Sequence, residues 1–175
     1  GCYYYEGEKQ FARENNTPGD WRALMEGEKR RGITYVVLAG AEPSLVPELC
    51  QACHDVIPLG SIASNGFKRI PESVGYRIHI SVWGNDESSR RIRNAKNLLA
   101  KQIENYRNDP RAVWVYTFTR ENIDEIYEVM EMLQKSGVAA FPSLTNQEVF
   151  SDPHFKARKL AVEVEHPAIG KQVVF

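Results

Sequence analysis

The chain of 175 residues has no long apolar run, no excess of either charge and no signal-peptide pattern. A membrane-spanning helix needs about 20 apolar residues, so none is expected. The 22 basic and 23 acidic residues nearly cancel. No basic stripe is interleaved with aromatic residues in the way that single-stranded nucleic acids require. We therefore predict a cytoplasmic protein with neither a membrane nor a nucleic acid as its partner.

Cysteine is scarce, with only Cys2, Cys50 and Cys53 present. Three cysteines are too few, and odd in number, for a disulfide framework, which leaves cofactor chemistry or packing. Cys50, Cys53 and His54 fit the C-x-x-C-H pattern of covalent haem attachment. However, Cys53 falls on the apolar face of a predicted helix, and Cys50 lies inside that helix instead of in its first turn, where a thiol of low pKa is expected. Packing is the favoured role for both, with His54 solvated on the helix surface.

The sequence also lacks a G-x-G-x-x-G motif and a phosphate-binding loop. An open-sheet nucleotide-binding domain therefore has no motif to support it, although it stays an alternative. The composition is ordinary for a soluble domain, with 42% hydrophobic and 26% charged residues. A chain of this length and composition can bury a core of its own.

The most informative stretch begins at 33–39, which is rich in β-branched and aromatic side chains. The run stops at a polar turn formed by Gly40, Ala41, Glu42 and Pro43. Such a run predicts a strand that is buried on both faces, followed by a helix with Ser44 as its N-cap. The turn would then lie at the carboxyl end of a buried strand, where α/β folds bind ligands.

Glu42 is the first candidate site residue of this turn. Because Pro43 restricts the preceding residue to an extended conformation, the Glu42 carboxylate should project from the strand end in a fixed direction. A carboxylate held in this way is suited to receiving an ammonium group. The alternative is a surface acid in an ordinary strand-to-helix turn.

Hydrophobic periodicity predicts strands that alternate with helices along most of the chain. The predicted strands are 33–39, 59–63, 76–83 and 113–118, with a final short strand at 138–141. The predicted helices are 20–31 with Asp20 as N-cap, 45–56, 88–106, and one that follows 119–122 and ends at Gly137. These short spacings fit right-handed crossovers, so we predict an α/β fold with a parallel sheet, as a β/α barrel or an open sheet.

The predicted strand at 76–83 alternates in polarity, with Arg77, His79 and Ser81 on one side and apolar residues on the other. In a parallel sheet, helices would cover the apolar side, and the polar side would face water or a ligand. We favour a ligand pocket over the wet side of an antiparallel strand. Asn85, after this strand, is a turn residue or a ribose contact, and Asn122 is a helix cap or a ligand contact.

The order of these features over 2–141 resembles that of the radical S-adenosylmethionine (radical SAM) enzymes. In that family three cysteines spaced C-x3-C-x2-C hold an iron-sulfur cluster, and Cys2 followed by Tyr3 is similar to the end of that motif. The turn at 40–43 is similar to the family's G-G-E-P turn, with Ala41 in place of the second glycine. The turn at 64–66 matches the turn after the family's third strand.

The resemblance implies a partial β/α barrel of radical SAM type that binds S-adenosylmethionine and a 4Fe-4S cluster. Such a domain generates a 5'-deoxyadenosyl radical, which abstracts hydrogen from a small-molecule or peptide substrate that the sequence does not identify. By this resemblance Cys2 would be a cluster ligand. The implied cofactor contacts are Gly40, Ala41, Glu42, Pro43, Asn65, Ser81 and Asn85. No residue is assigned a catalytic role.

The resemblance is incomplete, because the chain begins where the other two cluster cysteines should precede Cys2. A 4Fe-4S cluster in this family needs at least three protein thiolates. We therefore expect residues 1–175 alone to be inactive as an enzyme.

From about 142 the pattern changes. Asp152 should begin a short basic helix that ends near Leu160, and 161–165 is a candidate edge strand. Residues 137–175 resemble a segment of family III coenzyme A transferases, whose catalytic aspartate lies outside the matched part. We therefore predict a β/α domain at 1–141 and a C-terminal extension at 142–175. The alternatives are a non-catalytic remnant or chimeric module, or a fragment related to coenzyme A transferases.

Overall fold

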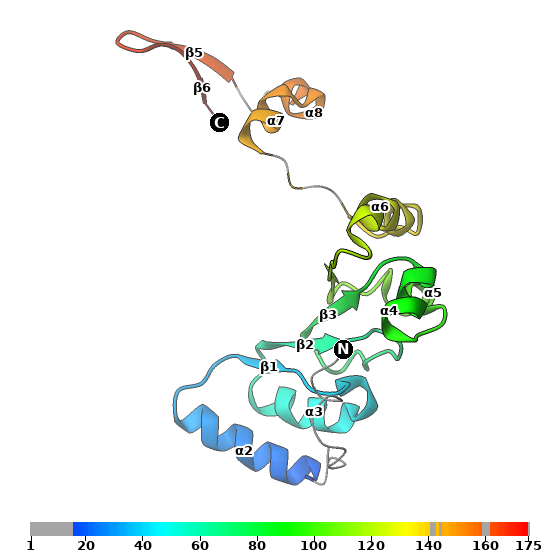
Figure 1. The fold of residues 1–175 in the computed structure, drawn as a ribbon. Coiled ribbons are helices and arrows are strands. Elements are labelled where there is room, and N and C mark those ends of the chain that lie inside the picture. Colours follow the sequence, from blue (N-terminus) through cyan, green and yellow to red (C-terminus); the bar gives the residue numbers. More distant parts are fainter. Residues whose placement is uncertain (1–15, 141–142, 144, 159–161, 175) are drawn as a thin grey trace. The chain divides into compact units, whose positions relative to one another are not determined.

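The structure is a computed structural model that describes residues 16–140, 143, 145–158 and 162–174. The chain divides into two compact units, 1–140 and 141–175, and each is considered by itself (Figure 1).

The first unit is built on a four-stranded parallel sheet. Its strands are β1 (Val36–Leu38), β2 (Gly60–Ser64), β3 (Arg77–Val82) and β4 (Ala112–Tyr116). They lie in the order β1-β2-β3-β4, and each neighbouring pair is parallel. The predicted α/β fold with a parallel sheet is therefore confirmed. Because strand order follows chain order, these four strands contain no reversal of the kind that forms the ligand crevice of a doubly wound fold.

The helices of this unit connect or flank the strands. They are α2 (Pro18–Arg30), the 3-10 turn η1 (Pro43–Leu45), α3 (Pro47–Val56), α4 (Asp86–Arg93), α5 (Leu98–Tyr106), the 3-10 turn η2 (Ile123–Glu125) and α6 (Ile126–Lys135). No helix in the described ranges is both long enough and apolar enough to span a bilayer.

Two predicted helix starts are wrong. Thr17, and not Asp20, is the N-cap of α2, because Asp20 occupies the third helical position and completes a capping box with Thr17. Ser44 does not cap α3, which begins after Val46 without a side-chain cap. Instead, the Glu42 side chain accepts a hydrogen bond from the Ser44 amide at the start of η1.

The predicted helix at 88–106 is in fact two helices. Asn94 and Asn97 both have left-handed backbones, with φ of 53° and 52°, which asparagine tolerates better than most residues. The Asp86 carboxylate accepts hydrogen bonds from the backbone amides of Leu99 and Ala100 and so caps α5 from the start of α4. This contact makes the break between the two helices a fixed part of the fold.

The predicted strand at 138–141 is absent over 138–140, and 141 lies outside the described residues. Gly137 has a φ of 87°, and the Val138 amide bonds back to the Leu133 carbonyl, which ends α6. Val138 then packs with Val82 and Leu133 in a small apolar cluster. The apolar side chain of Val138 is therefore buried in this cluster without its backbone joining the sheet.

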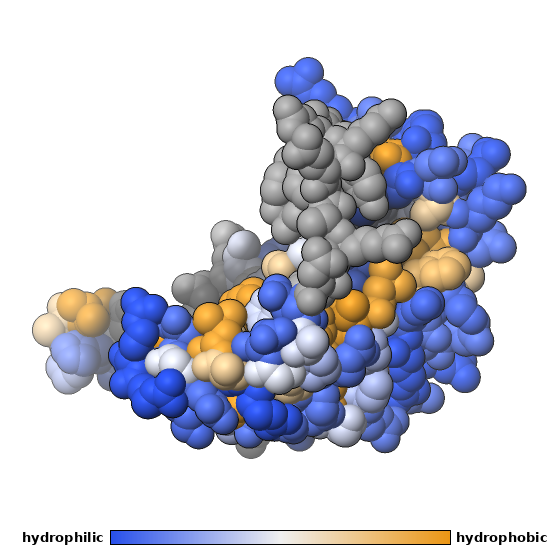
Figure 2. Space-filling model, turned by 90° about the horizontal axis from the view of Figure 1, so that it is seen from below, coloured by the Kyte–Doolittle hydropathy of each residue, from blue (hydrophilic) through white to orange (hydrophobic). Residues whose placement is uncertain are grey.

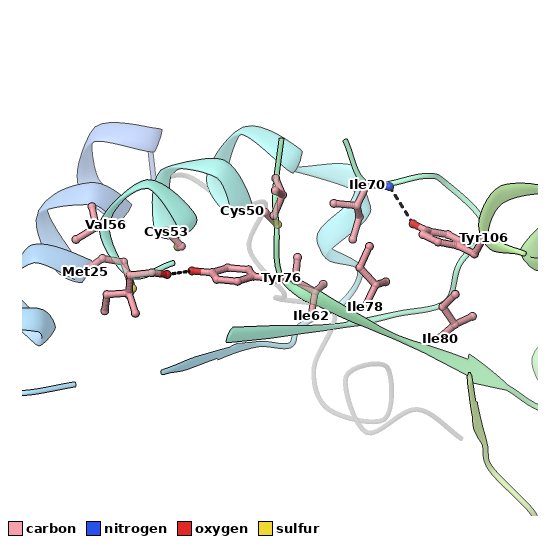
Figure 3. Packing of buried hydrophobic residues seen from close by; sticks show 12 residues of the cluster. Met25, Cys50, Cys53, Val56, Ile62, Ile70, Tyr76, Ile78, Ile80 and Tyr106 are labelled. Carbon is pink, nitrogen blue, oxygen red and sulfur yellow. Dashed lines mark hydrogen bonds between the residues drawn. The ribbon is translucent and has the colours of Figure 1, made fainter. Parts of the chain in front are cut away.

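The main core lies between the sheet and the helices α2 and α3. Ile62, Ile78 and Ile80 point from β2 and β3 toward the helices, where Cys50 and Cys53 meet them (Figure 3). Two buried tyrosines close the edges of this core. The Tyr76 hydroxyl donates to the Ile57 carbonyl at 2.5 Å, and the Tyr106 hydroxyl accepts from the Ile70 amide at 2.9 Å.

The opposite face of the sheet carries no helix residue of either apolar cluster. Its side chains alternate with the core residues along each strand. They are Val37, Ser61, Ala63, Arg77, His79, Ser81, Val113 and Val115. Val37 is 64% exposed and Val115 41%. Among the described residues, the helices of the two apolar clusters therefore lie on one face of the sheet, the arrangement that consecutive crossovers of one hand produce.

The second unit contains α7 (Asn146–Ser151), α8 (Pro153–Ala157), β5 (Val162–His166) and β6 (Gly170–Val174). Asp152 caps α8, which is shorter than the predicted helix. The predicted edge strand is β5, and it pairs with β6 as an antiparallel hairpin. All residues of β5 are exposed.

An ion pair at the amino end of β4 fixes the loop that precedes β3. The Arg111 guanidinium contacts the Asp109 carboxylate at 2.6 Å, and the Asp109 side chain is 1% exposed. Arg111 also donates to the carbonyls of Ile70, Pro71 and Val74. The hydrogen bonds from Arg111 hold the pKa of Asp109 below its usual value.

We predict that Arg111→Gln lowers the free energy of unfolding by about 3 kcal/mol at pH 7, because it removes the nearer of the two cationic partners of a buried carboxylate. Since the pKa of Asp109 is lowered by folding, this contribution is present above about pH 4 and is lost as the pH falls further. Urea unfolding at pH 7 and pH 3 measures both effects.

Arg69→Gln is the matched control, because Arg69 is exposed and lies 3.7 Å from the same carboxylate. Its effect should stay below about 1 kcal/mol. Equal losses in the two variants, or a loss in Arg111→Gln that does not shrink in acid, would contradict the assignment.

Candidate functional site

Three side chains tie the carboxyl ends of the four parallel strands together. The first is Glu42, which follows β1. Its Oε1 accepts hydrogen bonds from Ser64 Oγ at 2.7 Å and from the Ser44 amide at 3.1 Å. Its Oε2 accepts from the Asn65 amide at 2.8 Å. Glu42 therefore joins the turn after β1 to the end of β2.

The second tie is Gln102, which lies on α5 and is 1% exposed. Its Nε2 donates to the Asn65 carbonyl at 2.7 Å and to the Ser81 carbonyl at 2.9 Å. These carbonyls belong to the ends of β2 and β3. Gly66, with a φ of 71°, lies directly against Gln102, and a Cβ there would come within 2.9 Å of its side chain.

The third tie is Asn122, which is also 1% exposed. Its Nδ2 donates to the carbonyls of Trp83 and Thr117, at 3.1 and 3.0 Å, and its Oδ1 accepts from the Thr119 amide. The ends of β3 and β4 are joined in this way. The Asn122 side chain does not cap η2, and its amide group is used within the protein.

Gly40 and Ala41 lie beside the first tie and are exposed. No hydrogen bond connects the backbone of either residue to another part of the described chain. Their peptide groups are therefore available to a ligand. The Glu42 carboxylate is less available than the sequence suggests, because three protein donors already contact it. Pro43 is buried.

Asn65 and Ser81 lie on neighbouring strands near the same rim. Asn65 uses its backbone for Glu42 and Gln102, and its Oδ1 accepts from the Phe67 amide at 2.8 Å. The Ser81 hydroxyl lies on the helix-free face and has no hydrogen-bond partner among the described residues. The structure thus brings Glu42, Asn65 and Ser81 together, with Gln102 as the link.

Asn85 lies farther along the rim and serves as the N-cap of α4. Its Oδ1 accepts from the amides of Glu87 and Ser88, and its own amide donates to Glu125 Oε2 at 3.1 Å. Gly84 has a φ of 106°, and a Cβ there would lie 2.6 Å from the same Glu125 oxygen. The side-chain oxygen of Asn85 is therefore engaged in local structure.

The cysteines separate into two groups. Cys2 lies outside the described residues. Cys50 and Cys53 are 3% and 1% exposed, and burial raises the pKa of each thiol to about 11. The predicted packing role of the two cysteines is consistent with this placement. The prediction that His54 is solvated is wrong, because His54 is half-buried and its ring lies 5.0 Å from the Tyr76 ring between centroids. The described residues contain no group of three side chains that could hold a metal ion.

Gln102 is the residue of this rim that the sequence reasoning missed. It falls in the buried stripe of α5 with Leu98, Leu99 and Tyr106. A polar residue at a position that helical periodicity assigns to the core is a usable signal, because a buried amide needs partners. The partners themselves follow from the fold and not from the periodicity.

A scan of the chain against protein-family models and a search of curated proteins found no match.

We predict that Glu42→Gln lowers the free energy of unfolding by about 1–3 kcal/mol, because the new amide must face a backbone donor or leave it unpaired. Glu48→Gln on α3 is the control, since Glu48 is exposed and has no hydrogen-bond partner in the described ranges. Urea unfolding of both variants measures the difference. A Glu42→Gln protein as stable as Glu48→Gln would mean that the tie is not formed.

We also predict that Cys50 and Cys53 resist alkylation in the folded chain. At pH 8 thiols with a pKa of about 11 are almost entirely protonated, and these two are also shielded by the core. Iodoacetamide labelling followed by peptide mass spectrometry should modify both only after unfolding in urea. Rapid labelling of either residue in the folded protein would contradict its buried position.

Proposed function

We propose that this chain is part of a radical SAM-type β/α domain, and that the rim beside Glu42 binds the methionyl end of S-adenosylmethionine. The observation that supports this most is the combination of a fixed Glu42 with free peptide groups at Gly40 and Ala41. Consecutive strand order with helices on one face is also the arrangement of a partial barrel.

The residues at the rim are suited to the amino and carboxylate groups of a methionyl moiety. Backbone carbonyls at 40–41 can accept from an ammonium group, and backbone amides can donate to a carboxylate. The unpartnered Ser81 hydroxyl offers a further donor across the rim. Glu42 would act by holding the turn in position, because its carboxylate already has three donors.

The 4Fe-4S cluster, which supplies the electron that cleaves S-adenosylmethionine, does not fit this chain by itself. Such a cluster needs at least three thiolates. Cys50 and Cys53 lie in the core on the helix side of the sheet, which leaves Cys2 as the single candidate ligand. The proposal for these residues is therefore cofactor binding and not radical generation.

We predict that the whole chain binds S-adenosylmethionine in isothermal titration calorimetry, and that Ser81→Ala weakens binding about fivefold, the value of one hydrogen bond of about 1 kcal/mol. Ser61→Ala is the matched control, because Ser61 is on the same face near the amino end of β2. It should leave the affinity unchanged.

A second pair of variants tests the turn. A Cβ at Gly40 would have no atom within 4 Å, so Gly40→Val should fold normally while its side chain obstructs the adjacent peptide groups. Binding should fall about tenfold or more if two backbone hydrogen bonds are lost, and Gly40→Ala should lose less. No binding to the parent chain, or equal binding by Gly40→Val, would refute the proposal.

A further inference from the structure

The helix-free face of the sheet carries two basic side chains and no acidic one. Arg77 and His79 project from β3, and the strand residues beside them on β1, β2 and β4 are apolar or hydroxyl-bearing. Neither side chain has a hydrogen bond or ion pair among the described residues. Parallel sheets are normally covered on both faces. In the described ranges no helix residue of either apolar cluster lies on this face, and Arg77 is exposed and His79 half-buried there.

From this arrangement we infer that the helix-free face binds a small organic anion across β2 and β3, with Arg77 and His79 as its recognition residues. Charge complementarity selects the anion, because a carboxylate or phosphate group is what unpaired guanidinium and imidazole groups recognise. Arg77 is exposed and His79 half-buried, so a ligand could reach both.

The register places the surrounding residues so that a ligand has room on one side. His79 lies between Ala63 on β2 and Val113 on β4. The small Ala63 side chain leaves space beside the imidazole on the β2 side, whereas the larger Val113 side chain occupies the β4 side. Ser61, directly beside Arg77, is only 4% exposed and offers a ligand no accessible hydroxyl. An anion would therefore lie over the half-buried Ala63, between the two basic residues.

The anion site is inferred from the residues of the sheet only. Its identification as a substrate site rests on the proposed function. Alternate residues of a strand are about 7 Å apart, so His79 lies next to Ser81 along β3. If Ser81 contacts S-adenosylmethionine, an anion at His79 would be its neighbour, displaced toward the amino ends of the strands. The substrate class would then be an organic anion.

The test is a titration of the whole chain, followed by amide NMR spectra, with citrate as the carboxylate probe and pyrophosphate as the phosphate probe. Shifts should concentrate at 61–63 and 77–81. Arg77→Gln and His79→Gln should each weaken binding of the preferred probe about tenfold, because each loses a charge-assisted hydrogen bond. Arg77→Lys, which keeps the charge, should retain more affinity than Arg77→Gln.

Arg107→Gln is the matched control, because Arg107 is an exposed arginine after α5 with no ion pair in the described ranges. Equal weakening by Arg107→Gln would show non-specific attraction and overturn the inference, as would the absence of binding by either probe. Stronger binding of one probe identifies the anionic group.

Measuring S-adenosylmethionine binding in the same variants separates the two proposals. Loss of anion binding alone in Arg77→Gln, with S-adenosylmethionine affinity retained, supports two adjacent sites. A chain that binds S-adenosylmethionine but neither anion would eliminate the anion site only. A chain that binds an anion but not S-adenosylmethionine would eliminate the proposed function only.

Discussion

The carboxyl rim of this sheet depends on hydrogen bonds that join consecutive strand ends. Glu42 connects β1 to β2, Gln102 connects β2 to β3, and Asn122 connects β3 to β4. Each takes up backbone or hydroxyl groups that would otherwise lie unpaired where the strand ladder stops. Side chains therefore hold the loops that follow the strands in place. The backbone peptide groups at 40–41, which have no hydrogen bond within the described residues, lie in one of these fixed loops.

The surface of the protein combines hydrophilic and hydrophobic residues (Figure 2). Figure 2 shows a largely hydrophilic face interrupted by separate groups of hydrophobic residues. The helix side of the sheet is covered by two apolar clusters, while the opposite side carries Arg77 and His79 and keeps Val37 and Val115 exposed.

The two ends of the strands are stabilised by different interactions. Near the amino ends, a single guanidinium from Arg111 contacts a buried carboxylate and three loop carbonyls. At the carboxyl ends, the strands are joined by hydrogen bonds of two neutral amides, Gln102 and Asn122, and one carboxylate, Glu42. Removal of the Arg111 charge leaves an ion buried, whereas removal of one rim tie leaves only neutral groups unpaired, so the two ends should differ in their sensitivity to substitution.

The sequence by itself determined the α/β class, four of the five predicted strands and the packing role of Cys50 and Cys53, because periodicity and β-branched content are local properties. The prediction that the first strand is buried on both faces is wrong, because Val37 is 64% exposed. The sequence also indicated Glu42, since a strand that stops at glycine and proline marks its own end. The tertiary structure alone decided how these residues are used. Glu42 became a tie because β2 places Ser64 and Asn65 beside it. Gln102 belongs to the rim because it donates a hydrogen bond to Asn65, which is distant in the chain. The helix predicted at 88–106 is divided in two because the Asp86 carboxylate caps the second helix at Leu99.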